Sequence, residues 1–331
     1  MRPNLKILLC FCVPLLALSA EQGPKSIPRP EADELERTVG ERIEAAVKVR
    51  SWTAPEPKNT KPAIYAVAAP QLDEILMRRV AQTFGVTGEL KRISGDTLGQ
   101  LGFEIREAAN TNSGKYRTVY FWLSTGRFGY DTGDDGYRYD RITKQHDVRG
   151  VPDKEEAKGK ALDILPILSL STNDLEHYPN GRLKWSSSGS TISYTDRVDN
   201  QRKIVVIARH VSFYQRVPYG GVTAGVGDGG RLRFSFVSEG KLASIELFFR
   251  KLVKVDEAKP KSSKEIIRDL RSQNAWSWYR TIASAMTITS CDLAYPQANS
   301  WFQQEYVRPF YMLNGTDSDG RTATLFVPAE W

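Results

Sequence analysis

The sequence has few of the residues that most hydrolases and metalloenzymes use for catalysis. It contains three histidines and three cysteines in 331 residues. His146, His177 and His210 are widely spaced, whereas a catalytic zinc usually takes two histidines one helical turn apart. The absence of a Gly-x-Ser-x-Gly elbow argues against a serine hydrolase. We therefore expect no metal ligands and no cofactor.

Long apolar runs are scarce too, and the one at the N-terminus predicts export. Residues 7–18 are apolar, follow Arg2 and Lys6, and precede Ser19 and Ala20, the small residues that a signal peptidase accepts. The run is shorter than the ~20 residues of a transmembrane helix. Residues 1–20 are thus predicted to be a signal peptide, and the mature chain to be secreted or periplasmic without a transmembrane segment.

Signal cleavage would remove Cys10 and Cys12 and leave Cys291 as a single thiol. One thiol cannot form an intramolecular disulfide. A Cys291-dependent hydrolase is one hypothesis, although no Gly-rich elbow or helix N-terminus flanks Cys291 to lower the thiol pKa. A buried small apolar side chain is the preferred interpretation.

The net charge of +7 does not indicate a nucleic-acid partner. A nucleic-acid-binding protein gathers its basic residues on one helix or stripe. Here acidic and basic residues alternate, as in residues 34–50. We interpret the excess as a solvated surface, and we expect no nucleic-acid binding.

Proline and hydrophobic spacing divide the mature chain into three parts. Residues 21–60 form a Pro-rich leader, an amphipathic helix over 31–50 and a linker. An N-terminal α+β unit follows over 61–145, with a strand at 63–67 and a helix at 72–84. The helix is expected to bury Leu72, Ile75, Leu76, Val80 and Phe84, and strands are expected at 102–107, 117–124 and 127–130.

The third part, residues 146–331, is a β-rich α+β domain. Helices are predicted at 153–165 and 261–270. The fold class is predicted to be α+β, with antiparallel sheets each covered by a helix. Strands are expected at 191–194, 203–213, 232–237, 242–252 and 286–295, with a final hairpin of 310–313 and 322–327.

The pattern resembles the PepSY-like modules of exported bacterial proteins, in tandem, so that two or more units are expected. Three stretches carry the resemblance: residues 71–85 with the following strands, residues 229–250, and residues 263–270 with 293–295 and 307–313. PepSY-like modules are found in protease propeptides and envelope regulatory proteins. The resemblance implies inhibition, chaperoning or ligand binding without catalysis. No metalloprotease zinc motif follows, so the chain is not itself a protease precursor.

Two further segments are candidate sites. Asp131, Asp134, Asp135 and Asp140 have enough carboxylates for calcium, but the spacing is not that of an EF-hand, and we expect an ordinary turn. Aromatic residues gather in the C-terminal third, where buried side chains would belong to the core and exposed ones could contact a partner. The candidate partner-binding residues are Trp276, Trp278, Tyr279, Trp301 and Tyr306.

The leading hypothesis is an exported, non-catalytic binding or regulatory protein. It would recognise a protein or peptide partner in the cell envelope or outside the cell. A periplasmic carrier of a small apolar ligand is the alternative, and the Cys291-dependent hydrolase is a third.

Overall fold

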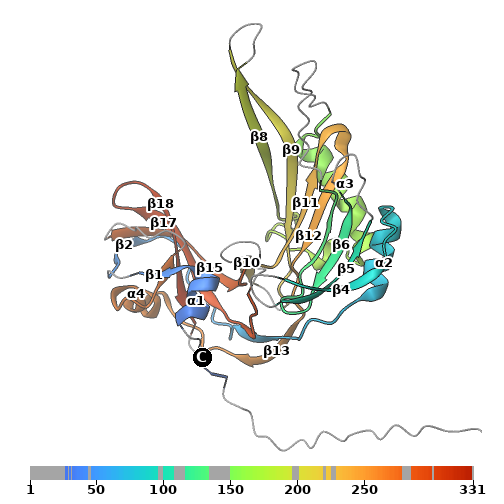
Figure 1. The fold of residues 1–331 in the computed structure, drawn as a ribbon. Helices are drawn as coiled ribbons and strands as arrows, with labels where there is room; N and C mark the ends of the chain where they lie inside the picture. Colours follow the sequence, from blue (N-terminus) through green and yellow to red (C-terminus); the bar gives the residue numbers. More distant parts are fainter. Residues whose placement is uncertain are drawn as a thin grey trace, which may run out of the picture.

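A computed structural model describes most of the chain outside the N-terminal segment and several loops. The strands form one sheet of eight, one of seven and one of three (Figure 1). The described residues are 27–28, 30, 32–43, 46–95, 100–107, 116–133, 150–195, 201–218, 221–224, 229–277, 285–299 and 302–329.

The eight-stranded sheet is antiparallel throughout and joins two runs of strands, β4 to β7 and β8 to β12, of which β10 alone belongs to another sheet. Its order is β4-β5-β6-β7-β12-β11-β9-β8, so the last strand of each run meets the other in the centre. The strands are β4 Leu90–Ser94, β5 Leu101–Arg106, β6 Thr118–Trp122, β7 Phe128–Asp131, β8 Trp185–Thr195, β9 Arg202–Tyr214, β11 Arg231–Phe236 and β12 Leu242–Leu247.

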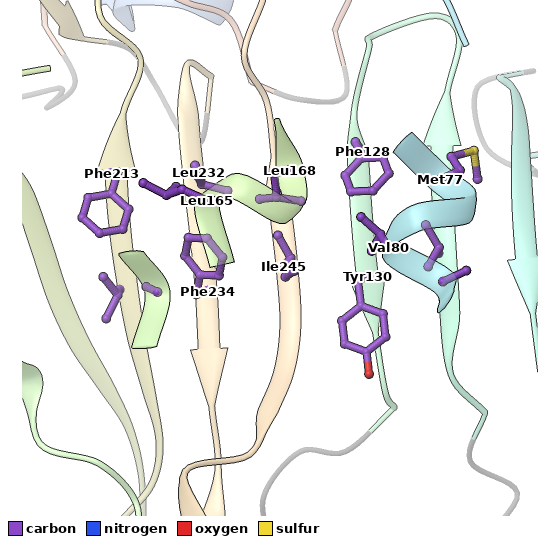
Figure 2. Packing of buried hydrophobic residues seen from close by; sticks show 14 of the residues in the cluster. Met77, Val80, Phe128, Tyr130, Leu165, Leu168, Phe213, Leu232, Phe234 and Ile245 are labelled. Carbon is purple, nitrogen blue, oxygen red and sulfur yellow. The ribbon is translucent and has the colours of Figure 1, made fainter. Parts of the chain in front are cut away.

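Two helices, α2 (Glu74–Thr83) and α3 (Lys154–Ile164), pack on one face of this sheet. Each begins after an aspartate, Asp73 or Asp153, whose carboxylate accepts backbone N–H bonds of the first turn. Figure 2 shows α2 over β7 and the short helix η1 (Leu165–Leu168) over β11 and β12. The largest apolar core of the molecule therefore lies between the helices and this face.

The seven-stranded sheet has the order β1-β14-β18-β17-β15-β10, and β2 pairs with β15 in parallel. Its core contains Met286, Ile288, Leu313 and Leu325, and the smaller helix α1 adds Val39 to a neighbouring cluster. The elements are α1 Ala32–Val39, β1 Glu41–Arg42, β2 Lys48–Trp52, β10 Val222–Ala224, α4 Ser263–Arg271, β14 Trp276–Ser277, β15 Ala285–Pro296, β17 Phe310–Asp317 and β18 Thr322–Pro328.

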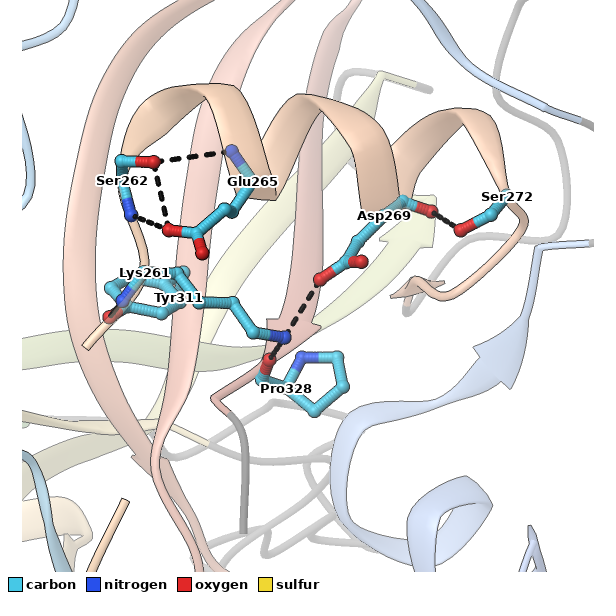
Figure 3. A network of polar contacts seen from close by, with 7 residues as sticks. All are labelled: Lys261, Ser262, Glu265, Asp269, Ser272, Tyr311 and Pro328. Carbon is cyan, nitrogen blue, oxygen red and sulfur yellow. Dashed lines mark hydrogen bonds and ion pairs between the residues drawn. The ribbon is translucent and has the colours of Figure 1, made fainter. Parts of the chain in front are cut away.

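Helix α4 is fixed to this sheet by a buried polar network (Figure 3). The Lys261 ammonium donates to the Asp269 carboxylate and to the Pro328 carbonyl, each at 2.7 Å. The Lys261 backbone N–H donates to the Tyr311 hydroxyl, and Ser262 and Glu265 form a capping box. Because Lys261 and Asp269 are both buried, removal of either partner would leave the other charge uncompensated.

A three-stranded sheet joins the two larger ones. β3 lies between β13 and β16, so the chain segments before α2, after β12 and before β17 meet there. Two further 3-10 turns complete the described elements. The bounds are β3 Ala63–Val67, β13 Leu252–Glu257, β16 Tyr306–Val307, η2 Thr172–Asp174 and η3 Ser238–Gly240.

The predicted fold class is wrong. Strands make up 45% of the structure and helices 19%, and the sheets are large rather than separate helix-covered PepSY-like units. The reason is strand pairing between segments far apart in the sequence: β7 pairs with β12, and β3 with β13 and β16. The domain boundary predicted at residues 145 and 146 falls outside the described residues and stays a prediction.

The single helix predicted over residues 31–50 is also wrong. α1 ends at Val39, because Gly40 takes a φ of 92° that a helix cannot continue, and β1 and β2 follow. Ile75 was expected to be buried on α2, but it is 77% exposed. Val80 is buried as predicted, and Met77 and Ala81, which were not predicted, face the core with it. The segment predicted as one strand over 242–252 divides into β12 and the start of β13, which belong to different sheets.

Candidate functional site

The register of the eight-stranded sheet separates an apolar face from a polar face. Alternate residues of a strand point to opposite faces. One line of paired residues is apolar and belongs to the core under α2 and α3: Ile105, Val119, Tyr130, Ile245, Phe234 and Val211. The adjacent line, one residue along each strand, is Lys91, Glu104, Tyr120, Gly129, Glu246, Arg233, Ser212 and Ser186.

A second polar line lies on the other side of the apolar one. We call the sheet surface that carries these two lines the polar face. Because α2 and α3 pack on the opposite side, these side chains are not part of the main core. The second line is Arg106, Thr118, Asp131, Ser244, Ser235, His210 and Ser188.

His210 links three strands on the polar face. Its Nε2 lies 2.7 Å from the Ser190 hydroxyl on β8, and its Nδ1 lies 2.9 Å from the Ser235 hydroxyl on β11. Burial, followed by the charges of Arg233, Arg209 and Arg231, lowers the pKa of His210 to about 4. The ring is therefore neutral at pH 7 and connects the strands through two hydrogen bonds. Serine rather than a carboxylate stands on the second ring nitrogen, unlike the catalytic triad of serine hydrolases.

The part of the polar face over β6, β7 and β12 is tightly packed. Arg127 donates to the Glu246 carboxylate at 2.9 Å, and its guanidinium lies 5.4 Å from the centre of the Tyr120 ring. The Tyr120 ring covers Gly129, where a Cβ atom would lie 2.3 Å from it. Burial raises the pKa of Tyr120 to about 12, so its hydroxyl keeps its proton. This packing makes the region a rigid support for the neighbouring strands.

The strand β8 forms one end of the sheet and pairs with β9 alone among the described strands. Its eleven residues, WSSSGSTISYT, include no charged residue and no proline. β9 pairs with β11 only over residues 209–214, so residues 190–195 and 202–208 continue beyond the sheet as a two-stranded ribbon (Figure 1). On that ribbon Ile204 is 68% exposed.

The two described aromatic candidates occupy different environments. Trp276 is buried in a core cluster and makes an edge-to-face contact with Phe310, so its placement is that of a core residue. Tyr306 is half-buried in β16, under the guanidinium of Arg308, and lines a cavity. Trp278, Tyr279 and Trp301 lie outside the described residues.

The cavity beside Tyr306 has a volume of about 270 Å³ and lies where the three-stranded and eight-stranded sheets meet. Arg250, which is buried, donates to the carbonyls of Ala298 and Phe302 and so holds the wall of the cavity in place. Ser124, Thr125 and Glu305 also line it. Its mixed polar lining differs from the apolar interior that a carrier of an apolar ligand needs.

The environment of Cys291 does not activate its thiol. Burial, with the nearby carboxylates of Asp292 and Glu56, raises the pKa of Cys291 to about 12. A nucleophilic cysteine needs the opposite shift, because the thiolate is the reactive form. In the described residues no three His, Cys, Asp or Glu side chains are grouped as a metal site. Of the acidic loop, Asp131 is described and accepts the N–H of Gly133 at 2.7 Å; Asp134, Asp135 and Asp140 are outside the described part.

Comparisons with known proteins do not identify a family. No family model matches the chain, and no curated protein matches it. A crystal structure of an uncharacterized protein from Eubacterium rectale aligns over 87% of this chain and 88% of its own, with 11% identity and a TM-score of 0.41. That score is too low to support an argument about fold or function. The resemblance to PepSY-like modules thus stays a prediction. None of the helices in the described segments has the length and apolar character to span a membrane.

Sequence reasoning missed both the polar face and the β8 edge. Ser190 and Ser235 are 20 and 25 residues from His210, and no spacing rule connects them. A strand was predicted only at 191–194, although residues 185–195 are long enough for a single strand and contain no charge.

Proposed function

We propose that the protein is an exported, non-catalytic binding protein that recognises an extended segment of a protein or peptide, in the cell envelope or outside the cell. The segment would add to the eight-stranded sheet as a further strand beside β8. The observation that carries this proposal is the long, uncharged strand β8 at the end of the sheet.

Strand addition needs an edge whose backbone N–H and C=O groups can reach a partner. Soluble proteins usually protect such edges with lysine, proline, bulges or short strands. The β8–β9 register shifts between Ser190 and Thr191, with the extra residue on β9, and β8 itself has neither charge nor proline. Its serine, glycine and threonine side chains are small, so a partner strand can approach the backbone. The neutral His210 bond to Ser190 holds β8 to β9 and so keeps this edge in place.

The other two hypotheses receive no support from the described residues. The thiol pKa of Cys291 opposes the hydrolase, and the cavity beside Tyr306 does not have the apolar lining of a carrier.

The test is selection of a phage-displayed library of random dodecapeptides on the full chain. Selected peptides are then examined by hydrogen exchange of the complex. We expect protection of the backbone amides of β8, and an affinity loss of about tenfold (about 1.4 kcal/mol) or more in the Ser188→Lys, Thr191→Lys variant. Both residues are exposed, so the variant should fold normally.

The matched control is the Ser94→Lys, Thr322→Lys variant, which adds the same charge at exposed strand positions elsewhere. It should bind the peptides as the native chain does. Equal losses in the two variants, or protection confined to other strands, would refute the β8 site. A concentration-dependent dimer that protects β8 would show that the occupant is a second copy of the chain instead.

A further inference from the structure

Two arginines on β11 have no counterion among the described residues. Arg231 and Arg233 are both half-buried on the polar face, two residues apart on one strand. Among the interactions of the described residues, neither guanidinium has a hydrogen bond or an ion pair. The Nε of Arg231 is fully buried and has no acceptor.

Two other arginines, beside strands of the same sheet, have carboxylate partners. Arg117 donates two hydrogen bonds to Glu107, each at 2.7 Å, and Arg127 donates to Glu246. Glu246 is the direct cross-strand neighbour of Arg233, yet its carboxylate bonds Arg127. The guanidiniums of Arg231 and Arg233 are therefore available to bind an anion. They lie in a region where a buried donor without an acceptor destabilises the folded chain.

The surroundings are rich in hydroxyl groups and positive in charge. Ser212 pairs with Arg233 across the strands, and Ser235 follows on the same face of β11; both serines are buried. The charges of Arg233 and Arg231 contribute to the low pKa of His210, with no carboxylate among the causes of that shift. Positions two apart on a strand are about 7 Å apart, which lets two guanidiniums approach one bound group.

We infer that Arg231 and Arg233 bind a phosphate or sulfate group on the polar face. A guanidinium presents a planar fork of N–H donors that matches the oxygens of such a group, and two of them match a dianion. The bound oxyanion would accept hydrogen bonds from the Nη groups of both arginines, which are not among the buried unsatisfied atoms of the described residues, and neighbouring hydroxyls can donate further bonds. This site is separate from the β8 edge, and either proposal can fail without the other.

The test is isothermal titration of the full chain, at low ionic strength, with inorganic phosphate, inorganic sulfate, phenyl phosphate and acetate. Phosphate and sulfate should bind, with acetate weaker by about tenfold or more because it carries one charge. The Arg231→Gln, Arg233→Gln variant should lose about tenfold or more in affinity for phosphate and sulfate. If phenyl phosphate binds as tightly as inorganic phosphate, the natural ligand is a phosphate group carried on a larger molecule. If phenyl phosphate binds more weakly, the natural ligand is the free ion.

The matched control is Lys91→Gln, Arg92→Gln, which removes the same charge from the same sheet and should retain the native affinity. Equal losses of affinity in the two variants would mean that net charge alone causes the binding, and would overturn the proposed site. The proposal would also be overturned if neither phosphate nor sulfate bound at a ligand concentration of about 10 mM, since a complex with a Kd of about 1 mM would then be nearly saturated.

The readout for folding is thermal unfolding. The double variant should unfold at or above the native temperature, since it removes two like charges without breaking a contact. If it does not fold, the native chain still gives a local readout, because a bound anion should raise the pKa of His210 in an NMR titration. An unchanged His210 pKa at saturating phosphate would place the anion elsewhere.

Discussion

The two ends of the eight-stranded sheet differ in length and in charge. β4, at one end, has five residues, of which Lys91 and Arg92 are exposed. β8, at the other end, has eleven residues, and none of them is charged. Both strands leave one row of backbone groups without a partner strand among the described elements. The sheet thus has one edge with the usual protection against strand addition and one without it.

The difference teaches that the composition of an edge carries information that the fold alone does not. A sheet of this size needs protection at both ends if the chain functions as a monomer without partners. The exposed charges of β4 protect that edge against strand addition in this chain. The absence of this protection at β8 therefore supports a contact that a charged strand would exclude.

Removing the charges of β4 should abolish the difference between the edges and has the largest expected effect. Cross-strand like charges destabilise pairing by roughly 0.2–1 kcal/mol each. The Lys91→Ser, Arg92→Ser variant should therefore self-associate up to about tenfold more strongly than the native chain, by up to about 1.4 kcal/mol. Sedimentation velocity over a range of concentrations measures this.

The control for this variant is a charge-neutral change on a helix, Lys154→Ser, Glu155→Ser. Unaltered sedimentation of the β4 variant would mean that charge is not what protects β4, and the comparison of the two edges would lose its basis.

The hydrogen bonds of His210 make the β8 edge sensitive to acid, with an intermediate expected effect. The pKa falls from the usual 6.5 to about 4 in the folded chain, so between these values the unfolded chain binds more protons. The contribution of His210 to stability is complete above about pH 6.5 and declines as the pH falls toward 4.

Urea unfolding at pH 7 and pH 5 should therefore show a smaller difference in His210→Gln than in the native chain. Hydrogen exchange at β8 should rise more steeply with acid than at β4. His177→Gln is the matched control, and an identical pH dependence in all three proteins would rule out this role for His210.

The smallest effect is expected on the ribbon. Ile204 is 68% exposed, so Ile204→Thr should change the free energy of unfolding by less than about 0.5 kcal/mol. If the partner also covers this part of β9, peptide affinity should fall while thermal stability is preserved. Thr322→Ser provides a control at an exposed strand position. A destabilisation of 1 kcal/mol or more would mean that Ile204 is buried in solution, and the ribbon would not be a free surface.

Local signals predicted several elements correctly. The strand at Ala63–Val67 has the predicted limits, and α4 lies at Ser263–Arg271, where a helix was predicted over 261–270. β4 was missed, because Leu90 and Ile93 alone do not alternate long enough to predict a strand. The helical spacing up to Val47 favoured one long helix, whereas pairing of β2 with β15, far along the chain, decided the outcome.

The candidate site was less accessible to sequence reasoning than the fold. The sequence predicted a strand at 232–237, and Leu232, Phe234 and Phe236 form the buried face of β11. Arg231, which precedes them, and Arg233, which lies between the first two, were not predicted to be a site. Arginine at two successive outward positions was a readable signal. Its importance depends on Glu246 bonding Arg127, which only the register and the side-chain geometry show.

The pairing of β7 with β12 has a consequence for how the chain reaches its folded state. These strands lie in the middle of the sheet, but α3 and the strands from β8 to β11 separate them along the chain. The strands β4 to β7 cannot complete their pairing until β12 has been synthesised, so β7 remains an unpaired edge during synthesis. Contacts of this range slow folding and expose the intermediate to aggregation. The first half of the chain should therefore depend on a chaperone when it is produced without the second.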